Sequence, residues 1–161
     1  MKPLVRLLVI PALMLAACSP QAGAGAAPTP DAQATHPVSG LRVIPLTITQ
    51  GGKTHSFRVE VAETDEQQER GLMFRTELGA DEGMIFPKEP AQARSFWMRN
   101  TVIPLDLIFI GPDHRIVNII ANAVPYSLES LPSAAPVIAV LELNGGRAAQ
   151  LGIEPGATVT W

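Results

Sequence analysis

The sequence contains few of the residues that usually carry chemistry in small proteins. Its 161 residues include one cysteine and three histidines, and 5% of them are aromatic. The single cysteine, Cys18, cannot form an intramolecular disulfide, and thiol catalysis and cysteine metal sites are excluded from the domain that follows it. His55 and His114 lie in or beside turn signals, where solvated surface side chains are expected. This composition predicts no cofactor and no metal site.

Basic residues are also scarce, and they are not clustered. Without Lys2 and Arg6, ten basic residues remain against 15 acidic ones, and the ten are scattered along the chain. Nucleic-acid binding needs a basic cluster or stripe that neutralises the phosphates. No nucleic-acid partner is therefore expected.

The N-terminal residues have the composition of a secretion signal. Lys2 and Arg6 are followed by an apolar run over residues 7–17, which Pro11 interrupts, and then by Cys18. A charged start, a short apolar stretch and a small-residue cleavage site are the parts of a signal peptide. The run is about half of the roughly 20 residues that a membrane-spanning helix needs. Residues 1–17 are therefore predicted to be a signal peptide and not a permanent membrane span.

Cys18 is predicted to be the lipid attachment site. Residues 15–18 read LAAC, which resembles the lipobox of bacterial lipoproteins, where the thiol accepts a diacylglycerol. An ordinary secretory signal is the alternative. Ser19 is not the aspartate that resembles an inner-membrane retention signal, so we expect a periplasm-facing anchor in the outer membrane, with the lipid bilayer as a partner through Cys18. Residues 18–40 are small and proline-rich, which predicts a flexible linker.

Residues 41–161 are expected to form one β-rich domain. Apolar residues alternate with polar ones on both sides of Gly51-Gly52, which predicts a β-hairpin. Thr64 and Gln67 form a capping box that predicts a short helix ending near Gly71, and a second short helix is expected between Gly146 and Gly152. The further expected strands are 83–86, 94–99, 103–110, 115–121, 136–143 and a last strand ending at residue 161.

These elements predict a mostly β (α+β) fold. Short strands outnumber the helices, and turn signals separate them regularly, which favours a compact barrel-like or sandwich domain with two short peripheral helices. No segment is long enough to be a helical crossover between parallel strands of a doubly wound domain.

Several motifs resemble one known family. They read RGLMFR at residues 70–75, GMIF at 83–86, FWMRNT at 96–101 and IPLD at 103–106, followed by VLEL at 140–143 and Gly145-Gly146. Together they are similar to the family named domain of unknown function 192, across essentially all of residues 41–161. Arg99 is a departure, because lysine is at least as usual there, but the charge is kept. The resemblance implies a compact β-rich domain, often exported, with no established reaction.

Five residues of these motifs are candidates for a ligand site: Arg75, Trp97, Arg99, Asn100 and Asp106. Arginine, amide and indole groups together suit a small anionic or hydroxylated molecule, because arginine forks two hydrogen bonds onto an anion and indole stacks on a ring. The alternative is that Trp97 is buried and that residues 100–101 make a turn. The expected function is a tethered periplasmic domain that binds a small polar ligand or an envelope partner, with enzymatic activity left open.

Two carboxylates lie inside apolar runs, Asp106 in residues 103–110 and Glu142 in residues 137–143. A carboxylate on an apolar face must be paired, hydrogen-bonded or functional. One interpretation makes them internal struts that pair with Arg70, Arg75 or Arg99. Another makes them the catalytic pair of an envelope hydrolase.

Methionines offer a third hypothesis. Met73, Met84 and Met98 come from three separate segments, and thioethers are soft ligands for Cu(I), which Trp97 could cover. Core packing is the alternative, because methionine fills gaps in protein interiors.

Overall fold

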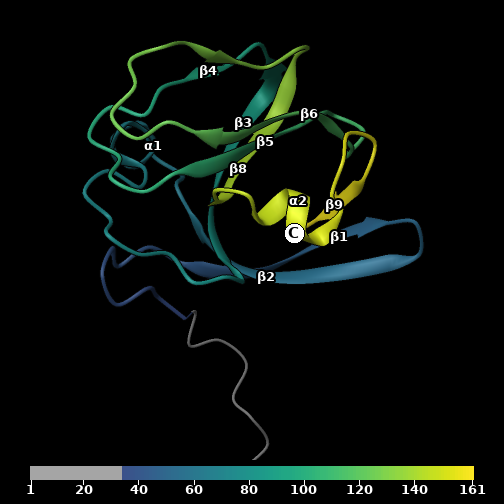
Figure 1. Ribbon diagram of the computed structural model, residues 1–161, viewed down its shortest axis with the longest axis horizontal. Coiled ribbons are helices and arrows are strands. Elements are labelled where there is room, and N and C mark those ends of the chain that lie inside the picture. The colour runs from purple at the N-terminus through teal and green to yellow at the C-terminus, as the bar shows by residue number, and fades with distance from the viewer. Residues whose placement is uncertain (1–33) are drawn as a thin grey trace, which may run out of the picture. The chain divides into compact units, whose positions relative to one another are not determined.

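The computed structural model describes residues 34–161, so the predicted signal peptide, Cys18 and most of the predicted linker lie outside the described residues. Nine strands and two short helices make up the described part (Figure 1). In chain order they are β1 (Val43–Gln50), β2 (Lys53–Val61), α1 (Asp65–Arg70), β3 (Glu82–Gln92), β4 (Ser95–Phe96), β5 (Leu105–Ile110), β6 (Ile116–Ala123), β7 (Leu131–Pro132), β8 (Val137–Asn144), α2 (Arg147–Leu151) and β9 (Thr158–Thr160). The predicted mostly β class is confirmed.

Local signals place the hairpin and both helices where the sequence predicts them. Strands β1 and β2 pair antiparallel from Val43 opposite Glu60 to Gln50 opposite Lys53. Gly51-Gly52 turns between them at φ 57° and 79°, a conformation that glycine adopts without steric cost. Helix α1 begins after Thr64, whose side chain accepts from the Gln67 amide in a complete capping box.

Seven strands form one mixed sheet in the order β6-β5-β8-β3-β2-β1-β9. The single parallel pair is β2 with β3, which are joined through α1. The sheet is not closed into a barrel, although its two ends meet at a single antiparallel bridge between Arg115 and Thr158. A separate two-stranded sheet pairs β4 with β7.

The bent sheet has a hydrophobic core on each face. One core joins β1, β2, β9 and α2 to one face of β3, β5 and β8. The other lies on the opposite face of β3, β5 and β8, where the β4–β7 sheet and residues 72–78 cover it. All six residues of β5 are buried for this reason. A polar residue in β5 or β8 is therefore enclosed whichever face it points to.

Three expectations differ from the structure in their extent. The predicted strand over residues 83–86 is part of the longer β3, which continues to Gln92. The predicted strand over residues 94–99 shortens to β4, because residues 97–101 leave the strand and turn beside residues 124–127. The chain is also fixed earlier than the expected boundary at residue 41. The Val43 amide donates to the Ala34 carbonyl at 2.7 Å, and Thr35 bridges Arg42, although the small, proline-rich composition had predicted a linker up to residue 40. No helix among residues 34–161 has the length and apolarity of a membrane span.

Candidate functional site

A pocket of about 420 Å³ lies where α1, β3 and the segment after β4 meet over β8. Gly71 ends α1 at φ 46°, and a Cβ there would come within 3.3 Å of the Phe86 ring, so the chain passes closely over this wall. The residues used below all line this pocket: Gln68, Arg70, Met73, Arg94, Trp97, Arg99 and Glu142.

Glu142 forms the base of the pocket. It lies in the central strand β8, where it is opposite Met84 of β3 and Leu107 of β5. Glu142 is 5% exposed, and its neighbours Met84 and Leu107 are fully buried. Among residues 34–161 its carboxyl group makes no hydrogen bond and no ion pair. An enclosed carboxyl group that opens only to a hollow has its hydrogen-bonding capacity free for a ligand.

Burial raises the pKa of Glu142 from its ordinary value of 4.5 to about 8. The cause is the loss of water around the charged form, since apolar side chains flank the strand position on both sides. At neutral pH the group is therefore mainly a carboxylic acid, which can donate one hydrogen bond and accept others.

Arg94 supplies a fixed cation in the same pocket. It donates to the Phe86 carbonyl at 3.3 Å and to Gln68 Oε1 at 3.0 Å, and its guanidinium lies 5.0 Å from the Phe96 ring centre. Gln68 is held in turn by the carbonyls of Ala62 and Pro87. Burial lowers the pKa of Arg94 from its ordinary value. A backbone carbonyl and a side-chain amide oxygen hold this arginine in place, and no carboxylate of the described residues forms an ion pair with it.

Arg70 and Arg99 add two cations nearer the opening. Their side chains form no ion pair within the part of the chain that the structure describes. Each guanidinium instead stacks on an exposed ring, Arg70 at 5.7 Å from the Phe74 centre and Arg99 at 5.5 Å from the Trp97 centre. Stacking orients a guanidinium and leaves its N–H donors available.

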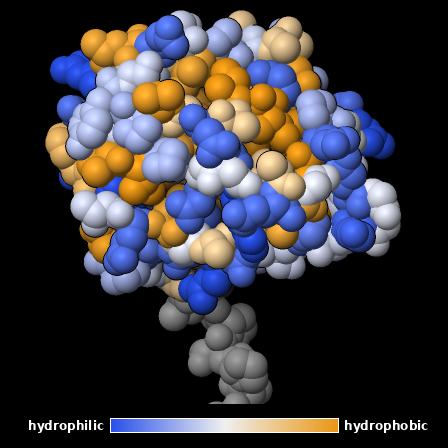
Figure 2. All heavy atoms as spheres, in the orientation of Figure 1, coloured by the Kyte–Doolittle hydropathy of each residue, from blue (hydrophilic) through white to orange (hydrophobic). Residues whose placement is uncertain are grey.

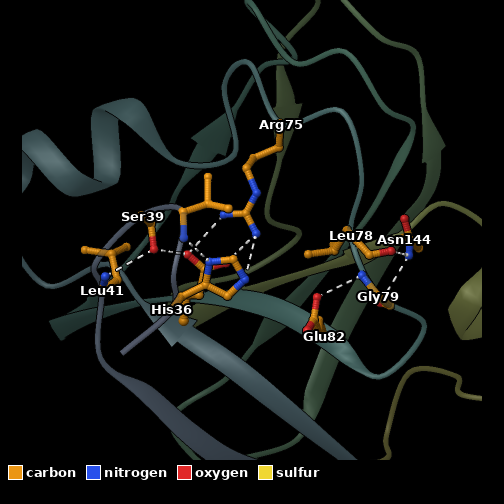
Figure 3. A network of polar contacts seen from close by, with 10 residues as sticks. His36, Ser39, Leu41, Arg75, Leu78, Gly79, Glu82 and Asn144 are labelled. Atoms are coloured by element: carbon orange, nitrogen blue, oxygen red, sulfur yellow. Dashed lines mark hydrogen bonds and ion pairs between the residues drawn. The ribbon is translucent and has the colours of Figure 1, made fainter. Parts of the chain in front are cut away.

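Two of the five predicted ligand residues, Trp97 and Arg99, line this pocket. Arg75 does not: its guanidinium forks onto Glu60 at 2.8 Å and 3.2 Å and reaches His36 Nε2 at 3.3 Å (Figure 3). Ser39 also donates to Glu60, so the network fixes the N-terminal turn against β2. The assignment of Arg75 to the ligand site is therefore not supported, because a buried carboxylate already takes up its donors.

Asp106 is fully buried, and its carboxylate accepts hydrogen bonds from three backbone amides. Oδ1 accepts from the amides of Asn122 at 2.9 Å and Gly146 at 2.8 Å, and Oδ2 accepts from Ala148 at 2.8 Å. Gly146 is the N-cap of α2 and has no side chain to cap it, so Asp106 satisfies these first amides from β5. The structural role predicted for Asp106 is thus present, but the predicted arginine partner is wrong, because backbone amides bind this carboxylate.

Asn100 is outside the pocket lining and belongs to the turn beside it. Its backbone has φ 56°, its carbonyl accepts from the Phe74 amide at 2.8 Å, and its side chain donates to Met73 Sδ at 3.8 Å. It therefore positions the segments that carry Arg70 and Arg99.

The geometry does not support the two other chemical hypotheses. Asp106 is opposite Leu143, the neighbour of Glu142, and alternate strand residues point to opposite faces, so the two carboxyl groups are separated by the sheet. Met84 and Met98 are fully buried among apolar side chains, as core residues are, while Met73 lines the pocket. Among residues 34–161 no group of three histidine, aspartate or glutamate side chains could hold a metal ion.

Sequence reasoning missed Arg70 and Arg94 as site residues. The sequence did indicate Glu142, because a carboxylate inside an apolar run must be paired, hydrogen-bonded or functional. The same pattern indicated Asp106 equally. For Arg94 the sequence offered only the nearby aromatic Phe96. Its position in the pocket is set by hydrogen bonds to α1 and β3.

The comparison with protein families agrees with the motifs that form this pocket. The model of DUF192, described as an uncharacterized ACR, matches residues 46–161. The chain belongs to the DUF192 family. Its match runs from β1 through β9 and so includes every element around Glu142. No curated protein matches the chain.

Two solved structures resemble this DUF192 chain closely. One is a protein of unknown function from Novosphingobium aromaticivorans, which is 58% identical with a TM-score of 0.79 and covers 82% of this chain and 94% of its own. The other, from Sinorhizobium meliloti, is described as a "putative transcription regulator". It is 39% identical with a TM-score of 0.70 and covers 72% of this chain and 91% of its own.

Proposed function

We propose that this DUF192 domain binds a small anionic, hydroxylated molecule in the Glu142 pocket. The observation that carries the proposal is an enclosed carboxyl group that has no hydrogen-bond or ion-pair partner among residues 34–161, in a pocket that three arginines line. Arg70, Arg94 and Arg99 favour a negative group, since no carboxylate of residues 34–161 pairs with them.

The protonated state of Glu142 narrows the ligand further. A carboxylic acid donates a hydrogen bond to an oxygen and accepts one from a hydroxyl group, whereas a cationic ligand would meet three like charges at the pocket wall. Trp97 adds an exposed indole face, which suits a sugar or another ring. A hydroxy acid, a sugar acid or a sugar phosphate fits these groups together.

The domain's place in the cell belongs to the same proposal. A lipid on Cys18 would hold the domain at the bilayer, facing the periplasm, with envelope-derived molecules within reach. DNA binding is not part of the proposal, because acidic residues outnumber basic ones and the pocket arginines surround a hollow instead of forming a stripe.

Thermal-shift screening of the purified protein tests the proposal. The panel contains sugars, organic acids, sugar acids, cell-wall fragments and Cu(I), and at least one anionic hydroxylated compound should raise the melting temperature. Arg99→Ala and Trp97→Ala should reduce that shift by at least half without lowering the melting temperature of the free protein, because both side chains are exposed.

A matched control is Arg58→Ala, which removes an exposed arginine of β2 outside the pocket lining and should leave the shift unchanged. The proposal fails if no compound acts on the wild-type protein. It also fails if Arg58→Ala weakens binding as much as Arg99→Ala does.

A further inference from the structure

We infer that the ligand of the Glu142 pocket is a single anionic amphiphile, whose polar head enters the pocket and whose apolar part lies on the surface beside it. This inference rests on the proposed function and adds the chemical class of the ligand. The added observation is an apolar rim formed by Phe74, Trp97, Val124, Tyr126 and Leu128.

The apolar rim concentrates most of the exposed large hydrophobic side chains. Seven such side chains are exposed among residues 34–161, and the rim holds five of them, at 48% to 69% exposure. Scattered single apolar residues need no explanation, but a gathering of five at one site does. Figure 2 shows that hydrophobic residues reach the surface of the viewed face in areas bordered by hydrophilic ones.

Backbone hydrogen bonds bring the three parts of the rim to the pocket. The Phe74 amide donates to Asn100 at 2.8 Å, the Tyr126 amide donates to Thr101 at 3.1 Å, and the Met98 amide donates to Ser127 at 2.9 Å. Segments 73–74 and 124–128 thus both lie beside residues 97–101, which line the pocket through Trp97, Arg99 and Thr101.

The rim is held in a conformation that local preferences do not favour. Phe74, Asn100 and Tyr126 have φ values of 64°, 56° and 62°. Bulky aromatic residues rarely adopt positive φ, and backbone hydrogen bonds to residues 100 and 101 help to hold the backbone of Phe74 and Tyr126 in this conformation.

At the border between the apolar rim and the pocket, two arginine guanidinium groups stack on aromatic rings. Arg70 lies over Phe74, and Arg99 lies over Trp97. A phosphate or carboxylate bound by these guanidinium groups would have its attached chain directly beside the rings. The cationic pocket next to the apolar rim therefore matches the charged head next to the apolar tail of an amphiphile.

The net negative charge of the domain favours a single bound amphiphile over an anionic membrane surface as the occupant of this site. Acidic residues exceed basic ones by five after Lys2 and Arg6 are set aside, so an anionic bilayer would repel the domain as a whole. An amphiphile taken up singly meets the pocket lining, where Arg70, Lys88, Arg94 and Arg99 outnumber the acidic Asp65 and Glu69.

Matched ligands test the inference on the purified protein. Glycerol 3-phosphate supplies the head alone, and a short-chain phosphatidylglycerol below its micelle concentration supplies the same head with apolar chains. By calorimetric titration, the amphiphile should bind at least about tenfold more tightly, because burial of a few methylene groups contributes that much. Val124→Ser with Leu128→Ser should abolish most of this gain and leave the affinity for glycerol 3-phosphate unchanged, because both side chains are exposed and lie outside the pocket lining.

Val38→Ser is the matched control, since Val38 is equally exposed but lies in the N-terminal turn, and it should keep the full gain. Leu128→Ser alone serves if the double variant does not fold. Equal affinity for the two ligands overturns the inference and leaves the proposed function standing. Binding only to vesicles of the same lipid overturns it in favour of a membrane-docking face. Binding of neither ligand overturns the inference, and the proposed function falls separately if the wider panel also gives no shift.

Discussion

At the scale of single residues, Glu142 and Asp106 show how the same side chain type takes opposite roles. Both carry a carboxyl group in a buried central strand, but three backbone amides satisfy Asp106 and no described group satisfies Glu142. A satisfied carboxylate contributes to the fold, and an unsatisfied one is a cost that a ligand can relieve. The proposed ligand binding therefore rests on Glu142 and not on Asp106.

Glu142→Gln should make the protein more stable at about pH 8 relative to wild type. Between the ordinary pKa of 4.5 and about 8, the folded wild-type protein retains a proton that the unfolded chain has lost, so its stability falls as the pH rises through this window. The loss is on the order of a few kcal/mol, and glutamine removes it. Urea denaturation at about pH 5 and about pH 8 measures the difference.

Glu129→Gln is the control for that experiment, because Glu129 is exposed and lies outside the pocket lining. It should show the same pH dependence as wild type. A Glu142→Gln protein whose stability tracks wild type across the whole range would contradict the assignment of a neutral, buried carboxyl group.

At the scale of elements, helix α2 depends on a residue that is distant in sequence. Asp106 of β5 accepts from Gly146 and Ala148, 40 and 42 residues further along the chain. The helix has five residues and no side-chain cap of its own. So short a helix is marginal by itself and is stabilised by tertiary contacts.

Asp106→Ala should therefore lower the free energy of unfolding by about 3 kcal/mol, because it leaves three amides without an acceptor, one of them buried and two partly buried. Asp106→Asn retains one acceptor oxygen and should cost less. Hydrogen exchange should show that the amides of residues 146–148 lose protection first. A loss below about 1 kcal/mol, with α2 still protected, would argue against the capping role.

The elements that could be predicted from the sequence are those with local causes. The Gly51-Gly52 hairpin and the capped helix α1 depend on residues within a few positions of each other, and both form as predicted. The β4–β7 sheet could not be predicted, since it pairs Phe96 with Leu131 across a long separation. Its two-residue strands carry no periodic signal of their own.

The site was predictable only in part for the same reason. Trp97 and Arg99 follow each other closely in one motif and stay together in the pocket. Whether Arg75 is free depends on Glu60, 15 residues away, and whether Asp106 is free depends on amides up to 42 residues away. Sequence patterns reveal a buried charge, but its partner is set by the tertiary fold.

At the scale of the whole molecule, a lipid anchor remains a prediction for the residues that precede the described domain. Cys18→Ser should leave the precursor uncleaved or mislocalised, because the modified thiol is the attachment point. Detergent phase partition and mass analysis of the mature N-terminus check this. A wild-type protein that enters the aqueous phase without an acylated cysteine would contradict it.

The meeting of the two ends of the sheet has a consequence for contacts between neighbouring copies of the domain. Exposed sheet edges are templates on which a neighbouring chain can add a strand and start aggregation. Here the Ile116 amide donates to Ala157 at 2.9 Å and the Val159 amide donates to His114 at 2.8 Å, so β6 and β9 occupy part of each other's open edge. This part of the two edges is therefore not available to pair with a strand of a neighbouring domain.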